Sequence, residues 1–247
     1  ENNLSQSKNS ILFLNTYGSL YSINNNKMNI NWFLNLNPSI DLNPSNLFYS
    51  NQIINNDELI VVAANKFTYV IDVKTGSLLW QKFTQNSEIF EDIMTLKMSN
   101  LIINDDSIYF SNNKNQFYSI DFNTGITNWI QKINSNVKPA IIGNFIFTIS
   151  IDGNFFIIEK NKGNILRITN IFDKINKKKN DNIFPTGFVF NFQNLFVSTN
   201  IGKLLVVEIK TGKVKNILKI DKDTISRPIV QKQNMYLIKD NSIVRFN

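Results

Sequence analysis

Short apolar runs separated by polar residues follow one another along the whole chain and predict β-strands. Each run is rich in Ile, Val, Leu, Phe or Tyr, is bounded by Asn, Asp or Gly, and is followed after a hairpin-like connection by a second alternating run. A helical period of 3.6 residues is not sustained anywhere, so we expect helices to be nearly absent. The first runs are Ile11–Leu14, Leu59–Val62, Ile108–Phe110, Phe145–Ile149, Leu195–Val197 and Met235–Ile238.

The second run belongs to a repeated phrase: a strand, an Asp, a Thr-Gly turn and a Trp. It is clearest at Tyr69–Trp80 and Tyr118–Trp129, and weaker copies occur at Tyr21–Trp32, Ile157–Arg167 and Val206–Asn216. The equivalent turn positions are 28, 76, 125, 163 and 212, which gives spacings of 48, 49, 38 and 49 residues. This is the length of one four-stranded propeller blade. The sequence therefore predicts an all-β propeller of four-stranded antiparallel blades, with about six blades in this chain.

The residues that recur in the phrase are predicted to pack one blade on the next. Large aromatic side chains supply contact area, and glycine permits the turn. A stack of tryptophans around a cofactor is the functional alternative, but the structural interpretation is preferred. The predicted packing residues are Trp32, Trp80, Trp129, Gly76, Gly125, Gly163 and Gly212.

These motifs resemble the repeat of the PQQ-like β-propellers, across the whole chain. Two branches of that family are relevant: the quinoprotein dehydrogenases, and the lipoprotein BamB of the outer-membrane β-barrel assembly machinery, which the chain resembles more. The resemblance implies a ring of eight blades, so residues 1–247 are expected to be a single domain forming the C-terminal part of a longer chain. A complete six-bladed ring closed by residues 1–9 is the alternative.

The absence of Cys and His limits the chemistry that this chain can perform. Disulfides, thiolate metal sites and the usual histidine bases are excluded. The carboxylate pairs Glu91/Asp92 and Asp105/Asp106 are adjacent on strands or beside them, so their side chains diverge. The recurring Asp72 and Asp121 are expected to accept turn hydrogen bonds. The dehydrogenase branch implies a calcium set and a vicinal disulfide that find no match here, so we expect no enzyme activity, cofactor or metal.

Positive charge is concentrated in the second part of the chain. Residues 159–247 hold 17 Lys/Arg and 7 Asp/Glu, whereas residues 1–158 hold 9 and 12. No Arg-rich helix, phosphate loop or nucleic-acid module accompanies this charge, so a nucleic-acid partner is not expected.

The repeat period breaks at Asn170–Pro185, where Ile171, Phe172 and Ile175 look exposed beside Lys177, Lys178 and Lys179. This loop is the predicted partner-binding site, and Leu34–Asn51 is the second candidate.

The resemblance to BamB implies a non-enzymatic scaffold that binds the barrel-inserting subunit of the assembly machinery. It implies a periplasmic location, with attachment to the outer membrane only through an anchor upstream of Glu1. Two alternatives remain open: an extracytoplasmic propeller that binds or senses a ligand, and a degenerate quinoprotein dehydrogenase. The fold does not decide among them, because propellers host many functions.

Overall fold

The computed structural model describes residues 4–15, 17–36, 50–55, 58–63, 67–84, 98–173, 175 and 182–246. Regular structure in these ranges consists of β-strands alone, as the sequence predicts. All six apolar runs singled out in the sequence lie within strands. The chain divides into two compact units, Glu1–Lys132 and Ile133–Asn247, which are described separately below.

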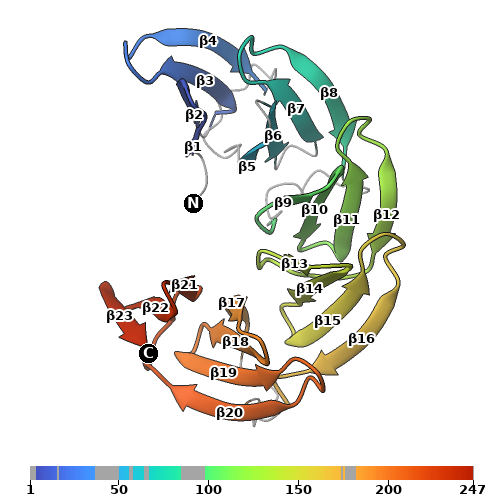
Figure 1. The fold of residues 1–247 in the computed structure, drawn as a ribbon, viewed down its shortest axis with the longest axis vertical. Helices are drawn as coiled ribbons and strands as arrows, with labels where there is room; N and C mark the ends of the chain where they lie inside the picture. The colour runs from blue at the N-terminus through green and yellow to red at the C-terminus, as the bar shows by residue number, and fades with distance from the viewer. Residues whose placement is uncertain are drawn as a thin grey trace. The chain divides into compact units, whose positions relative to one another are not determined.

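The first unit contains three four-stranded antiparallel sheets, each with its strands in chain order (Figure 1). The first sheet comprises β1 (Leu4–Gln6), β2 (Ser10–Leu14), β3 (Ser19–Asn24) and β4 (Ile30–Asn35). The second comprises β5 (Ser50–Asn55), β6 (Glu58–Ala63), β7 (Phe67–Asp72) and β8 (Leu78–Phe83). The third comprises β9 (Ile102–Asn104), β10 (Ser107–Asn112), β11 (Gln116–Asp121) and β12 (Thr127–Gln131).

The second unit contains two four-stranded sheets of the same topology and one sheet of three strands. Its first sheet comprises β13 (Ala140–Ile142), β14 (Phe145–Ile149), β15 (Asn154–Glu159) and β16 (Ile165–Asn170). The next comprises β17 (Pro185–Phe190), β18 (Asn194–Thr199), β19 (Lys203–Glu208) and β20 (Val214–Lys219). The last comprises β21 (Ile229–Gln231), β22 (Asn234–Lys239) and β23 (Ser242–Phe246).

The predicted number of blades was wrong. The described residues form five complete four-stranded blades, neither the six expected in this chain nor the eight of the larger ring. The count of six included the last repeat, where both apolar runs of the repeated unit are present. There they form β22 and β23, and with β21 they make only three strands.

Each blade has a β-bulge at the same place in its last strand pair. The register shifts between Ser22 and Ile23, Val70 and Ile71, Ser119 and Ile120, Ile157 and Ile158, and Val206 and Val207. A bulge increases the local twist of the strand pair that carries it. The repeated phrase therefore encodes both the turn and the bulge beside it.

The apolar core lies between consecutive blades rather than within one. Leu12, Leu14 and Leu20 of the first blade pack with Tyr69 and Ile71 of the second. In the second unit one cluster likewise draws on both four-stranded sheets. The middle strands β10 and β11 are buried on both faces, whereas the fourth strands β4 and β8 consist of exposed and half-buried positions. A single blade cannot bury both faces of its sheet, so neighbouring blades stabilise one another.

Candidate partner-binding surface

The carboxylate that recurs once per repeat is used by its own turn. Asp72 Oδ1 accepts hydrogen bonds from the backbone N–H of Lys74 and Thr75 and from the Thr75 hydroxyl, at 3.0, 2.7 and 2.8 Å. Asp121 makes the same three bonds with Asn123 and Thr124. The Thr75 backbone N–H holds the pKa of Asp72 below its ordinary value, and the Thr124 hydroxyl does so for the pKa of Asp121. These carboxylates therefore act as turn acceptors.

The other acidic side chains that the structure describes do not form a cluster with metal-binding geometry. Asp105 and Asp106 occupy the exposed turn between β9 and β10, and Glu91 and Asp92 lie outside the described residues. Within the part of the chain that the structure describes, no three His, Cys, Asp or Glu residues are placed to hold a metal ion. In that same part, no helix is long and apolar enough to cross a membrane.

Trp32 and Trp80 link each blade of the first unit to the next. The Trp32 indole N–H donates to the carbonyl oxygen of Val73 at 2.9 Å, and that of Trp80 donates to the carbonyl oxygen of Phe122 at 2.9 Å. Each ring lies on the turn glycine of the next blade. A Cβ added to Gly76 would stand 2.6 Å from Trp32 Cδ2, and one added to Gly125 would stand 2.9 Å from Trp80 Cε3.

The remaining predicted packing residues have less uniform surroundings. Trp129 stacks on Phe117 of its own blade, with ring centroids 5.9 Å apart, so its role between blades stays a prediction. Gly163 and Gly212 both adopt a φ of 73° in their turns, as the turn pattern requires. A Cβ on Gly212 would meet the Thr169 hydroxyl at 2.5 Å.

The exposure expected for Ile171, Phe172 and Ile175 was wrong. All three are buried in the core of the second unit. The segment after β16 folds back, with Ile171 N–H donating to Gly153 O, and the Phe172 ring occupies the space that a side chain at Gly153 would fill. These apolar residues therefore close the core and do not offer a partner surface. Lys177, Lys178 and Lys179 lie outside the described residues, as does most of Leu34–Asn51.

Arg167 replaces the tryptophan in the fourth blade and keeps its contact. Its guanidinium donates to the carbonyl oxygens of Ile209 and Lys210, and Ile209 is the position equivalent to Val73 and Phe122. The guanidinium also lies 5.8 Å from the centre of the Phe155 ring. Sequence reasoning missed this link because it looked for an aromatic residue, although the register of Arg167 opposite Ile157 matches that of Trp80 opposite Val70.

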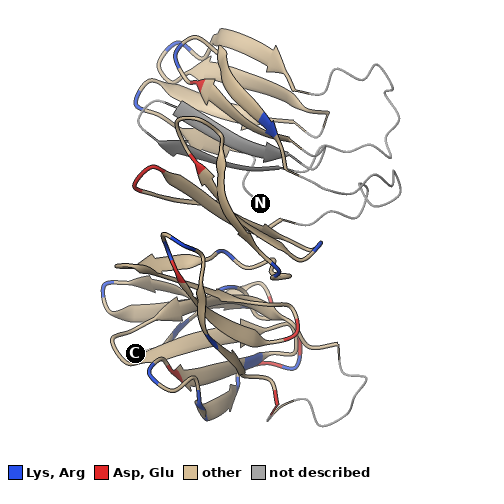
Figure 2. Ribbon diagram, turned by 90° about the vertical axis from the view of Figure 1, so that its right-hand side faces the viewer, with Lys and Arg blue, Asp and Glu red and all other residues tan. Residues whose placement is uncertain are grey.

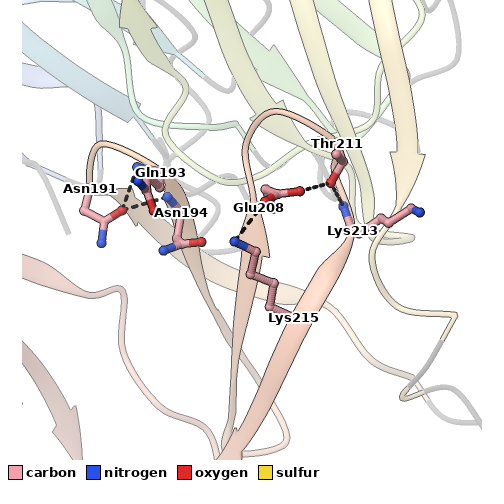
Figure 3. Close-up of polar contacts among 7 residues, drawn as sticks. All are labelled: Asn191, Gln193, Asn194, Glu208, Thr211, Lys213 and Lys215. Carbon is pink, nitrogen blue, oxygen red and sulfur yellow. Dashed lines mark hydrogen bonds and ion pairs between the residues drawn. The ribbon is translucent and has the colours of Figure 1, made fainter.

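The turn between β17 and β18 is the most prominent feature that the sequence did not reveal. Asn191 Oδ1 accepts hydrogen bonds from the backbone N–H of Gln193 and Asn194 at 3.0 and 2.7 Å (Figure 3). Ile209 N–H donates to Gln193 O and so joins this turn to the one between β19 and β20. Phe192 is fully exposed between these fixed residues. Its signal in the sequence is an aromatic residue placed inside an Asn-x-Gln-Asn turn.

The neighbouring turn between β19 and β20 is also ordered by side chains. Glu208 accepts hydrogen bonds from the Thr211 hydroxyl at 2.6 Å and from Lys215 Nζ at 2.9 Å (Figure 3). The Thr211 hydroxyl, followed by the Lys215 ammonium, lowers the pKa of Glu208. Lys213 extends away from this acidic group, as Figure 3 shows.

Lysines are frequent on the turns of the second unit that lie at the same end of the sheets as the two turns just described. Figure 2 shows the blue segments of Lys and Arg frequent in the unit that contains the C-terminus. The turns that follow the first and third strands of its sheets contribute Lys160, Lys162, Lys210, Lys213 and Lys232, with Glu159 and Glu208 at the strand ends. This excess of positive charge favours an anionic partner surface.

Comparisons with known proteins place the chain in a family. The family model described as outer membrane protein assembly factor BamB matches residues 5–169. The crystal structure of BamB from Moraxella catarrhalis superimposes with a TM-score of 0.72 at 13% sequence identity, covering 98% of this chain and 67% of that one, which supports the β-propeller fold. A search of curated protein sequences gave no match. The matched residues span most of the chain, and the chain belongs to the family of outer membrane protein assembly factor BamB.

Proposed function

We propose that this protein is a non-enzymatic scaffold of the outer-membrane β-barrel assembly machinery and that it binds the barrel-inserting subunit. Its membership of the BamB family is the observation that carries the proposal. The proposed location is the periplasm, at the outer membrane.

The chemistry of the side chains supports binding rather than catalysis. The chain contains no His, the most frequent general base, and no Cys, a strong nucleophile near neutral pH. The recurring carboxylates of Asp72 and Asp121 are occupied by turn hydrogen bonds. Within each unit, blades that pack on one another and present hydrogen-bonded turns are suited to holding a partner protein.

The test is a pull-down of the full-length tagged protein from its own cell envelope, with mass spectrometry of the proteins that co-purify. Recovery of the barrel-inserting subunit above the level of an untagged control is the expected result. Recovery of no component of the assembly machinery would refute the scaffold function and leave the family membership and the fold unchanged.

A further inference from the structure

Phe192 is the most exposed large apolar side chain in the described residues. Its relative exposure is 105%, and the next highest is that of Ile243 at 75%. Burying a phenylalanine side chain stabilises a folded protein, and Phe192, which is fully exposed, makes no such contribution to folding. An aromatic ring held entirely in solvent is available to a partner.

The backbone beneath Phe192 is fixed by hydrogen bonds on both sides. The Asn191 side chain bridges the turn through Gln193 N–H and Asn194 N–H, and Asn191 N–H donates to Asn194 O at 2.9 Å. Gln193 O accepts from Ile209 N–H at 3.0 Å, and the carbonyl of Ile209 accepts from Arg167 of the neighbouring blade. Binding through Phe192 therefore costs little ordering of the backbone, which favours affinity.

The surroundings of Phe192 identify the chemistry of the partner. The other turns at this end of the second unit are polar and basic, with Lys162, Lys210 and Lys213 exposed. We infer that Phe192 inserts into an apolar pocket with an acidic rim on the barrel-inserting subunit, an inference that rests on the proposed scaffold function. A buried aromatic anchor with polar and charged surroundings is the usual composition of a binding hot spot.

A protein pocket explains this surface better than a lipid surface does. Stable membrane attachment through an amphipathic surface needs a broad apolar face. In the described turns of this end, the other apolar side chains are the half-buried Ile209, which packs against the core, and the exposed Ile142 and Phe145 at the ends of β13 and β14 in the neighbouring blade. The single aromatic ring of Phe192, held on a fixed turn, is suited to a pocket of defined shape on a partner protein.

The experiment compares the wild-type protein with Phe192→Ala and with a matched control, Tyr17→Ala. Tyr17 is also an exposed aromatic on an Asn-capped turn, in which Asn15 Oδ1 accepts from Tyr17 N–H and Ser19 N–H. Each tagged full-length protein is used to pull down the barrel-inserting subunit from the cell envelope, and the affinity for the purified subunit is then measured. We expect Phe192→Ala to weaken affinity by about 30-fold or more and Tyr17→Ala to change it by less than about two-fold.

Two further variants test whether the hydrogen-bonded turn and the aromatic ring each contribute to binding. Asn191→Ala removes the turn acceptor and keeps the ring, so we expect an intermediate loss of affinity, whereas Phe192→Trp keeps an aromatic anchor and should retain most of the binding. Because Phe192 is exposed, the melting temperature of Phe192→Ala should match that of the wild type, which separates lost contact from lost fold.

Each other outcome has a definite meaning. Capture of the subunit by wild type and Phe192→Ala with equal affinity overturns the anchor and leaves the scaffold function intact. Failure of the wild type to capture the subunit refutes the scaffold function and, with it, the named partner. Flotation of the wild type, but not of Phe192→Ala, with vesicles of phosphatidylethanolamine and phosphatidylglycerol assigns the ring to a membrane surface instead.

Discussion

The turn glycines are constrained by a side chain of the preceding blade as well as by their own backbone. Gly76 has a φ of 75°, and the Trp32 ring lies where its side chain would be. The first blade carries Met28 at the equivalent position, with a φ of 55° and an exposed side chain. A turn of this shape thus accepts a side chain when no ring lies against it.

Gly76→Ala is expected to lower the free energy of unfolding by about 2–4 kcal/mol. About 1–2 kcal/mol comes from a left-handed backbone with a Cβ, and the remainder from displacing the Trp32 ring. Gly143→Ala is the control, because Gly143 also has a positive φ and nothing among the described residues would lie within 4 Å of its Cβ. Urea unfolding of both variants measures the difference, and equal losses would refute the contribution of the ring.

The recurring aspartate gives a pH-dependent contribution to stability. Because hydrogen bonds from Thr75 lower the pKa of Asp72 below 3.8, its charged form is favoured in the folded state. This contribution is present above pH 3.8 and is lost as pH falls through the lower pKa of the folded state. The first blade has the neutral Asn24 in this place, where its Oδ1 accepts from Asn26 and Lys27 N–H.

We therefore expect two different responses at position 72. Asp72→Ala should cost about 1 kcal/mol at pH 7 through the lost turn hydrogen bonds, and the deficit should shrink below about pH 3.8. Asp72→Asn should retain most of the stability at pH 7 and remove this part of the pH dependence. Urea midpoints measured from about pH 2.5 to about pH 7 test this, and a deficit for Asp72→Ala that is constant with pH would contradict it.

At the scale of elements, the strands could be predicted closely from sequence because apolar runs and Asn or Gly turns determine them locally. Leu59–Val62 lies within β6 and Phe145–Ile149 coincides with β14. The burial of Ile171 and Phe172 could not be predicted, because it depends on Gly153 in a different hairpin. The nearby lysine run suggested an exposed loop, but neighbours in sequence do not determine how a segment folds back on the core.

Arg167 links the strand β16 to the next blade through hydrogen bonds. Arg167→Ala leaves Ile209 O and Lys210 O without this donor and is expected to cost about 2–3 kcal/mol. Arg167→Lys should recover only part of this loss, because an ammonium lacks the planar fork that reaches two carbonyls. Arg167→Trp should also recover part, since an indole makes the equivalent bond in the first unit.

Thermal and urea unfolding of these three variants provide the measurement. The expected order of stability places the wild type first, Lys and Trp between, and Ala last. Unchanged stability in Arg167→Ala would show that the guanidinium contacts do not hold the two blades together.

For the molecule as a whole, the repeat predicted the propeller but not the exposed ring of Phe192. A period of about 48 residues follows from the turns, whereas Phe192 interrupts a polar turn and has no counterpart in the repeat. The net charge of +7 is the global property most relevant to association. Its effect on binding depends on ionic strength.

Association with the barrel-inserting subunit is expected to slow as salt rises from about 0.1 M to about 1 M, because the Debye length falls from about 10 Å to about 3 Å. The dissociation rate should change less, since long-range charge acts mainly on encounter. Surface plasmon resonance at several salt concentrations measures both rates, and Lys210→Glu should reduce the salt dependence. Association that is independent of salt would exclude electrostatic steering.

The pairing of Trp32 with Gly76, and of Trp80 with Gly125, has a consequence for how such repeats can be rearranged. The matching residues belong to different blades, so a blade transplanted alone separates each tryptophan from its glycine. Placing the first blade, with Met28 in its turn, directly after a tryptophan-bearing blade would force a ring against a Cβ. To keep each tryptophan with its glycine, chimeric proteins built from such repeats must therefore be joined within a blade, so that a whole interface between two blades is exchanged.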